Sequence, residues 1–138
     1  MTRMIFVNLP VRALGAAREF YVALGGTVKS QFSDERSNCV MFSDAIGVML
    51  LTHERYGEFT SRPIGDARSQ SQALLALSFD SRDEVDTTIA RAVGAGGKAD
   101  PNPAQDLGFM YNRTVEDPDG YVWEIFWMDP AGIAGDGT

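Results

Sequence analysis

DPDGYVWEIFW, residues 117–127, is the stretch of sequence that decides the fold. Pro118 presets the first backbone angle of a tight turn, and Gly120 supplies the left-handed position that closes a hairpin. Beyond the turn, alternation predicts a strand with Glu124 on one face and both tryptophans on the other. A carboxylate in the middle of a strand is costly to bury without a partner, so Glu124 is the first candidate for a functional side chain.

The register of the hairpin determines what Glu124 faces. The preceding arm is predicted over residues 109–115. A two-residue turn would place Arg113 directly opposite Glu124. A type I turn with a glycine bulge would instead place Thr114 opposite Glu124 and Arg113 on the diagonal. In both registers we expect a contact between the arginine and the glutamate, and we expect the tryptophans to pack under a helix.

The rest of the chain predicts the same succession of elements twice. In the first part, a strand closed by Pro10 precedes an amphipathic helix that ends at Gly25, and three strands follow. In the second part, Ser81 and Glu84 form a capping-box pattern at the start of a helix between one strand and three more. The predicted strands span 4–9, 27–32, 39–42, 46–52, 74–79, 98–100, 109–115 and 121–128, and the predicted helices span 14–24 and 81–93.

This repetition predicts a single α+β domain over residues 1–138, built from paired βαβββ modules. Each helix would cover one sheet face, and the other faces would form a curled mixed sheet around a cavity, with the helices outside. The long polar connector is typical of either a linker or a functional loop. The predicted segments are 3–56 for the first module, 57–72 for the connecting loop, 73–130 for the second module and 131–138 for the tail.

Composition argues against several classes of function. The net charge of −7 argues against nucleic-acid binding, because a phosphate-binding surface needs a basic stripe, and it would help to capture a cationic ligand. Cys39 is the single cysteine, so we expect no internal disulfide and no thiolate metal cage, and Cys39 itself to be a small buried hydrophobe. No signal peptide or bilayer-spanning run is visible, which predicts a cytoplasmic protein without a membrane partner.

Three pieces of the sequence carry a family resemblance through their order and spacing. They are Asn8–Leu14 leading to Phe20-Tyr21 and Leu24-Gly25, Leu77–Phe79 before Glu84–Asp86, and Glu116–Gly120 leading to Trp123–Ile125. Over nearly the whole chain, this pattern resembles the vicinal oxygen chelate superfamily of glyoxalase I, extradiol dioxygenases, fosfomycin-resistance enzymes and bleomycin-resistance proteins. The resemblance implies the paired-module fold, a small-molecule cavity and pairing into homodimers.

The resemblance also implies where a divalent metal would be held. The ligand positions of the family, one on each of four strands, fall at Phe6, Leu50, Ala76 and Glu124. Only Glu124 can ligate, whereas a transition-metal site needs about three protein ligands. We therefore predict no metal cofactor. The alternative is a rearranged divalent-metal site that combines Glu124 with Asn8 or His53, although His53 is otherwise explained as an exposed strand-end residue.

Side chains on the same faces would line the cavity. Phe6 and Phe126 would make its wall aromatic and apolar, which suits a planar or hydrophobic ligand. Tyr111 could offer a hydroxyl group, although cross-strand packing also explains a hairpin tyrosine. The full set of predicted ligand-binding residues is Phe6, Asn8, Leu50, Ala76, Tyr111, Arg113, Glu124 and Phe126.

Three functional hypotheses follow. The first is a metal-free binding protein of the bleomycin-resistance type, which pairs into a homodimer and holds a small hydrophobic or cationic molecule. The second is an enzyme, lactoylglutathione lyase-like or dioxygenase-like, in which Glu124 is the catalytic group within a rearranged metal shell. The third is a dimeric scaffold without a small ligand.

Overall fold

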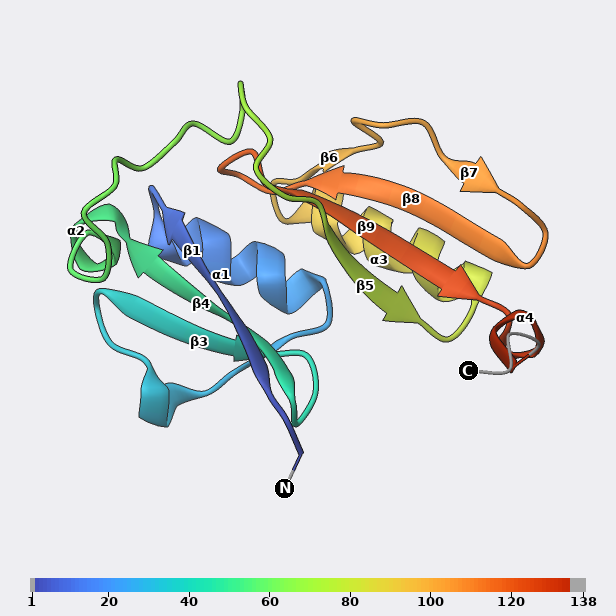
Figure 1. The fold of residues 1–138 in the computed structure, drawn as a ribbon, viewed down its shortest axis with the longest axis horizontal. Helices are drawn as coiled ribbons and strands as arrows, with labels where there is room; N and C mark the ends of the chain where they lie inside the picture. The colour runs from blue at the N-terminus through green and yellow to red at the C-terminus, as the bar shows by residue number, and fades with distance from the viewer. Residues whose placement is uncertain (1, 135–138) are drawn as a thin grey trace.

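A computed structural model describes residues 2–134 of the chain as two mixed β-sheets with one long helix behind each (Figure 1). The first half contains β1 (Ile5–Val11), α1 (Leu14–Ala23), β2 (Thr27–Val28), β3 (Ser37–Met41) and β4 (Ile46–Thr52). The second half contains β5 (Leu75–Phe79), α3 (Arg82–Gly94), β6 (Lys98–Ala99), β7 (Gln105–Asp106), β8 (Met110–Glu116) and β9 (Val122–Met128). Three short helices complete the chain, namely the 3₁₀ helix η1 (Ser30–Phe32), α2 (His53–Tyr56) and α4 (Pro130–Ala134).

Each half has the strand order expected for a βαβββ unit. The first sheet runs β1-β4-β3-β2, and the second runs β5-β9-β8-β6 with β7 paired to β8. In each sheet, the strand before the helix pairs in parallel with the last strand of that half, and the remaining pairs are antiparallel. β1 crosses in front of α1, and β9 crosses in front of α3, so both helices lie on the same side of the two sheets (Figure 1). The predicted fold class is confirmed.

Several element boundaries differ from the prediction, and three of the differences change how the chain is read. β1 continues through Pro10, because β1 is an edge strand and a proline there can direct its missing N–H away from the neighbouring strand. The strand predicted over 27–32 ends at Val28 and is followed by η1. The tail predicted over 131–138 begins within α4, and its residues 135–138 lie outside the described residues.

The start of α3 follows the capping rule that its sequence indicated. The Ser81 hydroxyl oxygen accepts the backbone N–H of Glu84 at 3.1 Å. The Glu84 carboxylate reaches back to the backbone N–H of Asp80 at 3.0 Å, one residue earlier than in the standard capping box. None of the helices within residues 2–134 is long and apolar enough to cross a bilayer.

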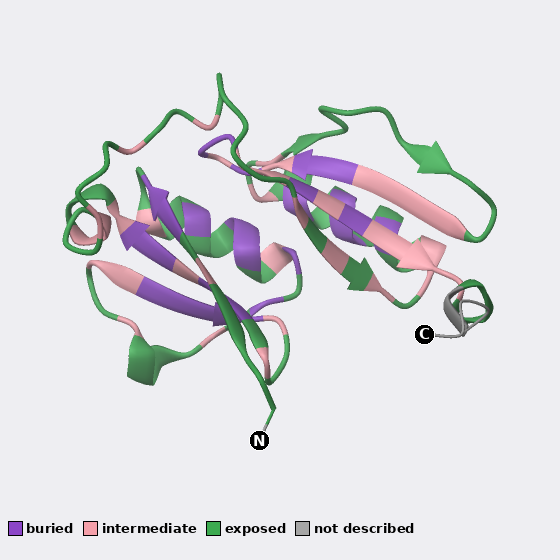
Figure 2. Ribbon diagram, viewed as in Figure 1, coloured by how far each residue is buried: buried purple, intermediate pink, exposed green. Residues whose placement is uncertain are grey.

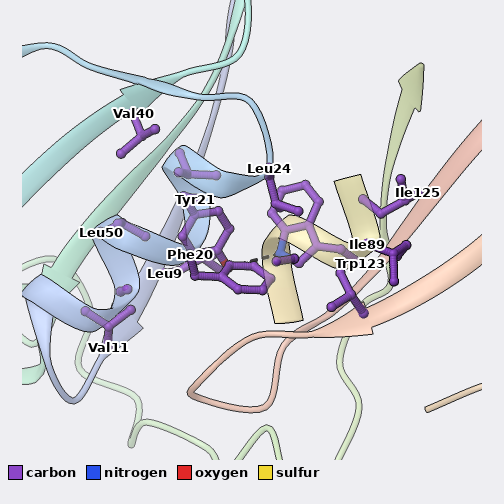
Figure 3. Packing of buried hydrophobic residues seen from close by; sticks show 14 of the residues in the cluster. Leu9, Val11, Phe20, Tyr21, Leu24, Val40, Leu50, Ile89, Trp123 and Ile125 are labelled. Atoms are coloured by element: carbon purple, nitrogen blue, oxygen red, sulfur yellow. Dashed lines mark hydrogen bonds between the residues drawn. The ribbon is translucent and has the colours of Figure 1, made fainter. Parts of the chain in front are cut away.

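The core joins the two halves through their helices. Figure 2 shows buried residues along α1 and α3, and Figure 3 shows Phe20 and Tyr21 of α1, with Leu24 just after it, on the side of Trp123 and Ile125 of β9. The Tyr21 and Trp123 rings meet edge to face with centroids 5.6 Å apart. The indole N–H of Trp123 donates to the Tyr21 hydroxyl at 3.0 Å, so a tryptophan of the second half is anchored on the helix of the first.

The hairpin between β8 and β9 has the bulged register. Gly120 has a φ of 103°, and the backbone N–H of Gly120 donates to the Asp117 carbonyl at 3.1 Å. Thr114 lies directly opposite Glu124, while Arg113 lies opposite Ile125. Because directly paired residues share a sheet face, Arg113 is on the helix side. The expected contact between Arg113 and Glu124 is therefore wrong.

Candidate functional site

The face of the first sheet that α1 leaves open carries a groove of about 990 Å³. Strand pairing sets its floor in rows that cross β1, β4 and β3. One row consists of Asn8, Met49 and Cys39, and the next consists of Phe6, Gly47 and Met41. The floor is therefore built from an aromatic ring, sulfur-containing side chains and one amide, a surface suited to an apolar molecule.

A glycine on β4 shapes this floor. A Cβ atom at position 47 would collide with the thioether sulfur of Met41 and would lie 3.1 Å from the carbonyl oxygen of Val40. Because Gly47 has no side chain, the flexible Met41 side chain can lie across β4.

Cys39 is buried, as its sequence context predicted, and only 2% of it is exposed. Its side chain nevertheless belongs to the groove face and not to the core beneath α1. Burial raises the pKa of the Cys39 thiol, and nearby Lys29 acts weakly in the opposite direction. The thiol is therefore an apolar part of the floor and not an activated nucleophile.

The residue of β4 that faces the groove was predicted one position too late in the sequence. Leu50 is fully buried in the core that includes Val48 and the inner face of α1. Met49 occupies the groove face in its place. The sequence of β4 is apolar on both faces, so periodicity could not distinguish the two positions.

His53 does not reach the groove. The strand ends at Thr52, whose side-chain oxygen accepts the backbone N–H of Arg55 at 3.1 Å and caps α2. His53 is the first residue of α2 and is exposed. It lies near Arg12 and Tyr121 at a small hollow beside the connector, away from the groove floor.

The open face of the second sheet holds the remaining predicted residues. Ala76, Glu124 and Thr114 form one row across β5, β9 and β8, and Phe126 lies in the next row. The Glu124 carboxylate is half-buried and accepts a hydrogen bond from the Asn112 side-chain amide at 3.3 Å. The other side-chain atom of that amide, Asn112 Oδ1, is buried without a hydrogen-bond partner among the described residues. Sequence reasoning found Glu124 but missed its partner Asn112.

Glu124 and the groove therefore lie on different sheets of the chain. Phe6 and Asn8 line the groove, whereas Ala76, Glu124 and Phe126 do not. All five residues lie on open sheet faces. Strand alternation had placed Asn8 with Phe6 and Phe126 with Glu124, whereas the positions of Phe6 and Ala76 came from the family resemblance. The sequence did not show how far apart the two faces lie.

Tyr111 and Arg113 turn toward α3, which corrects their predicted place in the cavity. The Tyr111 hydroxyl donates to Asp86 at 2.7 Å, and Arg113 donates to Asp86 at 2.9 Å and to Asp100 at 2.8 Å. These hydrogen bonds, first that of Tyr111 and then that of Arg113, lower the pKa of the Asp86 carboxyl. The pair ties β8 to its covering helix and has a structural role.

Comparison with known proteins now places the chain in a family. The model of the Glyoxalase/Bleomycin resistance protein/Dioxygenase superfamily matches residues 3–125. The chain belongs to this superfamily. No curated protein sequence matches it.

Solved structures share the fold of this chain at low sequence identity. A glyoxalase-related enzyme from Fulvimarina pelagi has a TM-score of 0.75 and 22% identity, covering 92% of this chain and 88% of its own. A hypothetical protein from S. aureus has a TM-score of 0.75 and 20% identity, with 92% and 95% covered. A fosfomycin resistance protein from Mesorhizobium loti has a TM-score of 0.63 and 15% identity, with 97% and 96% covered. At such identities the likeness establishes the fold alone.

The metal positions of the superfamily are not matched by suitable donors in this chain. Phe6 and Ala76 carry hydrocarbon side chains, and the fourth-strand position offers either buried Leu50 or the weak thioether of Met49. No three His, Cys, Asp or Glu side chains within residues 2–134 are grouped so that they could hold an ion. This donor set does not fit a transition-metal ion.

Proposed function

We propose that the chain is a small-molecule binding protein of this superfamily, which holds a largely apolar ligand on the open face of its first sheet. The groove of about 990 Å³ is the observation that supports this function. Its volume is at the upper end of the range usual for small-molecule pockets. Phe6, Met49 and Cys39 supply apolar and polarizable contact area, and Asn8 offers an amide for orientation.

Binding without chemistry is the reading that the side chains favour. The groove contains one thiol, whose pKa is raised by burial, and one carboxylate, that of exposed Asp44. Glu124, the predicted catalytic group, has an amide neighbour, and within residues 2–134 no histidine or second acid is hydrogen-bonded to it. The pairing of a base with a nucleophile or a metal-bound water, which catalysis of this type requires, has no counterpart there.

The proposed binding form is a homodimer. Ile5 and Phe6 at the start of β1 and Ile46 at the start of β4 are exposed apolar residues. An apolar patch next to an open groove is typical of a surface that another protein covers. A second copy placed over this face would shield both the patch and the open side of the groove. In such a dimer, the second sheet of one copy could face the groove of the other copy. Ala76, Glu124 and Phe126 would then contact a ligand bound to the other copy.

A neutral fluorescent probe tests the proposed function. We expect phenylnaphthylamine to bind saturably and to gain fluorescence as it leaves water. Substitution Met49→Trp should abolish this binding, because the larger ring fills the centre of the groove floor. Val22→Trp is the matched control, since Val22 is exposed on α1, on the other side of the sheet. Circular dichroism of both variants would verify that they remain folded.

The outcomes separate binding from non-specific adsorption. If phenylnaphthylamine does not bind saturably, or if the Met49 and Val22 variants bind it equally, the groove is not a ligand site. Elemental analysis of the purified protein is a second, independent measurement. We expect transition metals far below one ion per chain, and a stoichiometric ion would instead favour the enzyme hypothesis.

A further inference from the structure

The net charge of the side chains that line the groove is opposite in sign to the net charge of the whole chain. Lys29, Arg55 and Asp44 are the Lys, Arg, Asp or Glu side chains that line it, which gives two basic groups against one acidic group. The chain as a whole carries a net charge of −7. The charged side chains that line the groove therefore differ in net sign from the chain as a whole.

Lys29 stands at the β2 edge of the groove floor. Its backbone N–H donates to the carbonyl oxygen of Cys39 at 2.8 Å, which extends the pairing of β2 with β3 by one residue. This pairing places Lys29 next to Cys39 in the row that continues through Met49 and Asn8. Within residues 2–134, no carboxylate lies within ion-pair distance of Lys29, so its ammonium group is free to meet a ligand.

Arg55, on α2, is held at the groove by two contacts with the turn that follows the helix. Its guanidinium group pairs with Glu58 at 2.5 Å and lies 4.5 Å from the centre of the Phe59 ring. Glu58 is shared with Arg36, whose nearest nitrogen is 2.6 Å away, so the carboxylate bridges two arginines. The guanidinium is thus positioned before any ligand binds, although part of its charge is already compensated.

We propose that the groove takes amphipathic anions, with an apolar ring or chain on the floor and an acidic group at Lys29. This inference rests on the proposed function and names the chemical class of its ligand. Glu124 favoured a cationic ligand when only the sequence was considered, but Glu124 lies on the second sheet and does not line the groove. The hydroxyl group of Ser30 and the side-chain amide of Asn8 also line it and can donate hydrogen bonds to an acidic group.

A matched pair of probes tests the sign of the ligand. Anilinonaphthalenesulfonate is phenylnaphthylamine with an added sulfonate, so the two differ in charge but share the apolar skeleton. We expect Lys29→Met to weaken binding of the sulfonate by about fivefold, the scale of one exposed ion pair, and to leave the neutral probe unchanged. Added salt should weaken binding of the sulfonate alone, because exposed charges are screened.

The chain offers a natural control, because it contains only two lysines. Lys98→Met makes the same change in net charge on β6 of the other sheet, where Lys98 lies 4.0 Å from Glu116. Lys98→Met should leave both probes unaffected, and Lys29→Arg should retain the affinity for the sulfonate. Together these variants separate a local contact from a general effect of charge.

The possible results distinguish this inference from the proposed function. If phenylnaphthylamine binds and Met49→Trp abolishes its binding, the groove is a ligand site whatever Lys29 does. If Lys29→Met then changes both probes equally, or changes neither, the inference about anions is overturned while the binding function stands. If neither probe binds, the proposed function fails and the inference fails with it.

Discussion

Asp117 holds the two halves together through a buried carboxyl group. Its Oδ2 accepts the Tyr21 hydroxyl at 2.5 Å, and its Oδ1 accepts the backbone N–H groups of Asp119 and Tyr121 at 2.9 Å. Burial raises the pKa of this carboxyl to about 6, while the hydrogen bonds oppose the rise. Tyr21 is itself buried, and its burial, together with the neighbouring Asp117 carboxylate, raises the pKa of the Tyr21 hydroxyl well above its ordinary value.

The raised pKa predicts how stability depends on pH. A carboxyl with a folded-state pKa of about 6 and an unfolded pKa of about 3.9 binds more protons when folded. Its stabilising contribution is therefore complete below about pH 4 and is lost as pH rises through about 6. Asp117→Asn mimics the protonated form and removes this dependence. The measured quantity is the free energy of unfolding of the variant minus that of the parent, from urea denaturation. We expect this difference to rise by about 2 kcal/mol from pH 4 to pH 7.

Comparing the parent with Asp117→Asn separates the pH dependence due to Asp117 from that due to the other carboxyl groups. Asp106 and Asp86 have lowered pKa values because arginine or tyrosine donors favour their charged forms, so their contributions are lost as pH falls. Those groups are unchanged by Asp117→Asn and cancel in the difference. A constant difference between the two proteins over this pH range would mean that Asp117 ionises as easily as it does in water.

At the scale of residues, the sequence predicted best where alternation was clear. Glu124 and Phe126 lie on the open face as predicted, because the tryptophans of β9 marked the opposite face unambiguously. Leu50 was misplaced because its strand is apolar on both faces. Arg113 was misassigned for a different reason. Long-range partners such as Asp86 on α3 are set by tertiary packing, which local periodicity does not contain.

At the scale of elements, the turn before β9 depends on one glycine. Gly120 has a φ of 103°, and a Cβ atom there would lie 2.7 Å from the backbone nitrogen of Arg68 and 2.9 Å from the carbonyl carbon of Ala67. The connector therefore passes directly over the turn, and Arg68 also donates to the Pro118 carbonyl at 2.6 Å. The turn needs glycine both for its backbone conformation and for this close approach.

Gly120→Ala should destabilise the protein by about 2 kcal/mol or more, since strain and a backbone collision add together. Gly65→Ala is the matched control in the same connector, because nothing lies within 4 Å of a Cβ atom there and its φ is ordinary. The control should be neutral or slightly stabilising. Thermal denaturation of both variants measures the difference. Equal effects of the two substitutions would show that the connector does not rest on the turn.

The elements with local signals were predicted well, and those without were not. The hairpin had its turn sequence, and α3 had its serine cap, so both were found from the sequence. The short strand β7 consists of Gln105 and Asp106, which have no strand preference, and it exists because it pairs with β8. In the same way η1 and α2 are single turns stabilised by neighbouring contacts and not by helix propensity.

At the scale of the whole molecule, the repeat was visible in the sequence, but the division of the site was not. Two βαβββ units in one chain predicted two open sheet faces, and both exist. The sequence suggested that these faces share one cavity, whereas the groove is lined by residues of the first half alone. The relative placement of the sheets follows from the packing of Tyr21 and Trp123 between them, a long-range contact that has no local pattern.

The open first sheet leads to a prediction about assembly. Ile5 and Ile46 are paired neighbours at the exposed end of this sheet, with 58% and 41% of their surfaces accessible. If a second copy covers this end, light scattering should give twice the 15.0 kDa mass of one chain, and Ile46→Lys should convert the dimer to a folded monomer. Val22→Lys is the matched control, because Val22 is 46% exposed on α1, and this variant should remain dimeric. A parent protein that stays monomeric at every concentration, or a dimer indifferent to Ile46→Lys, would show that this face is not the interface and that the groove works within one chain.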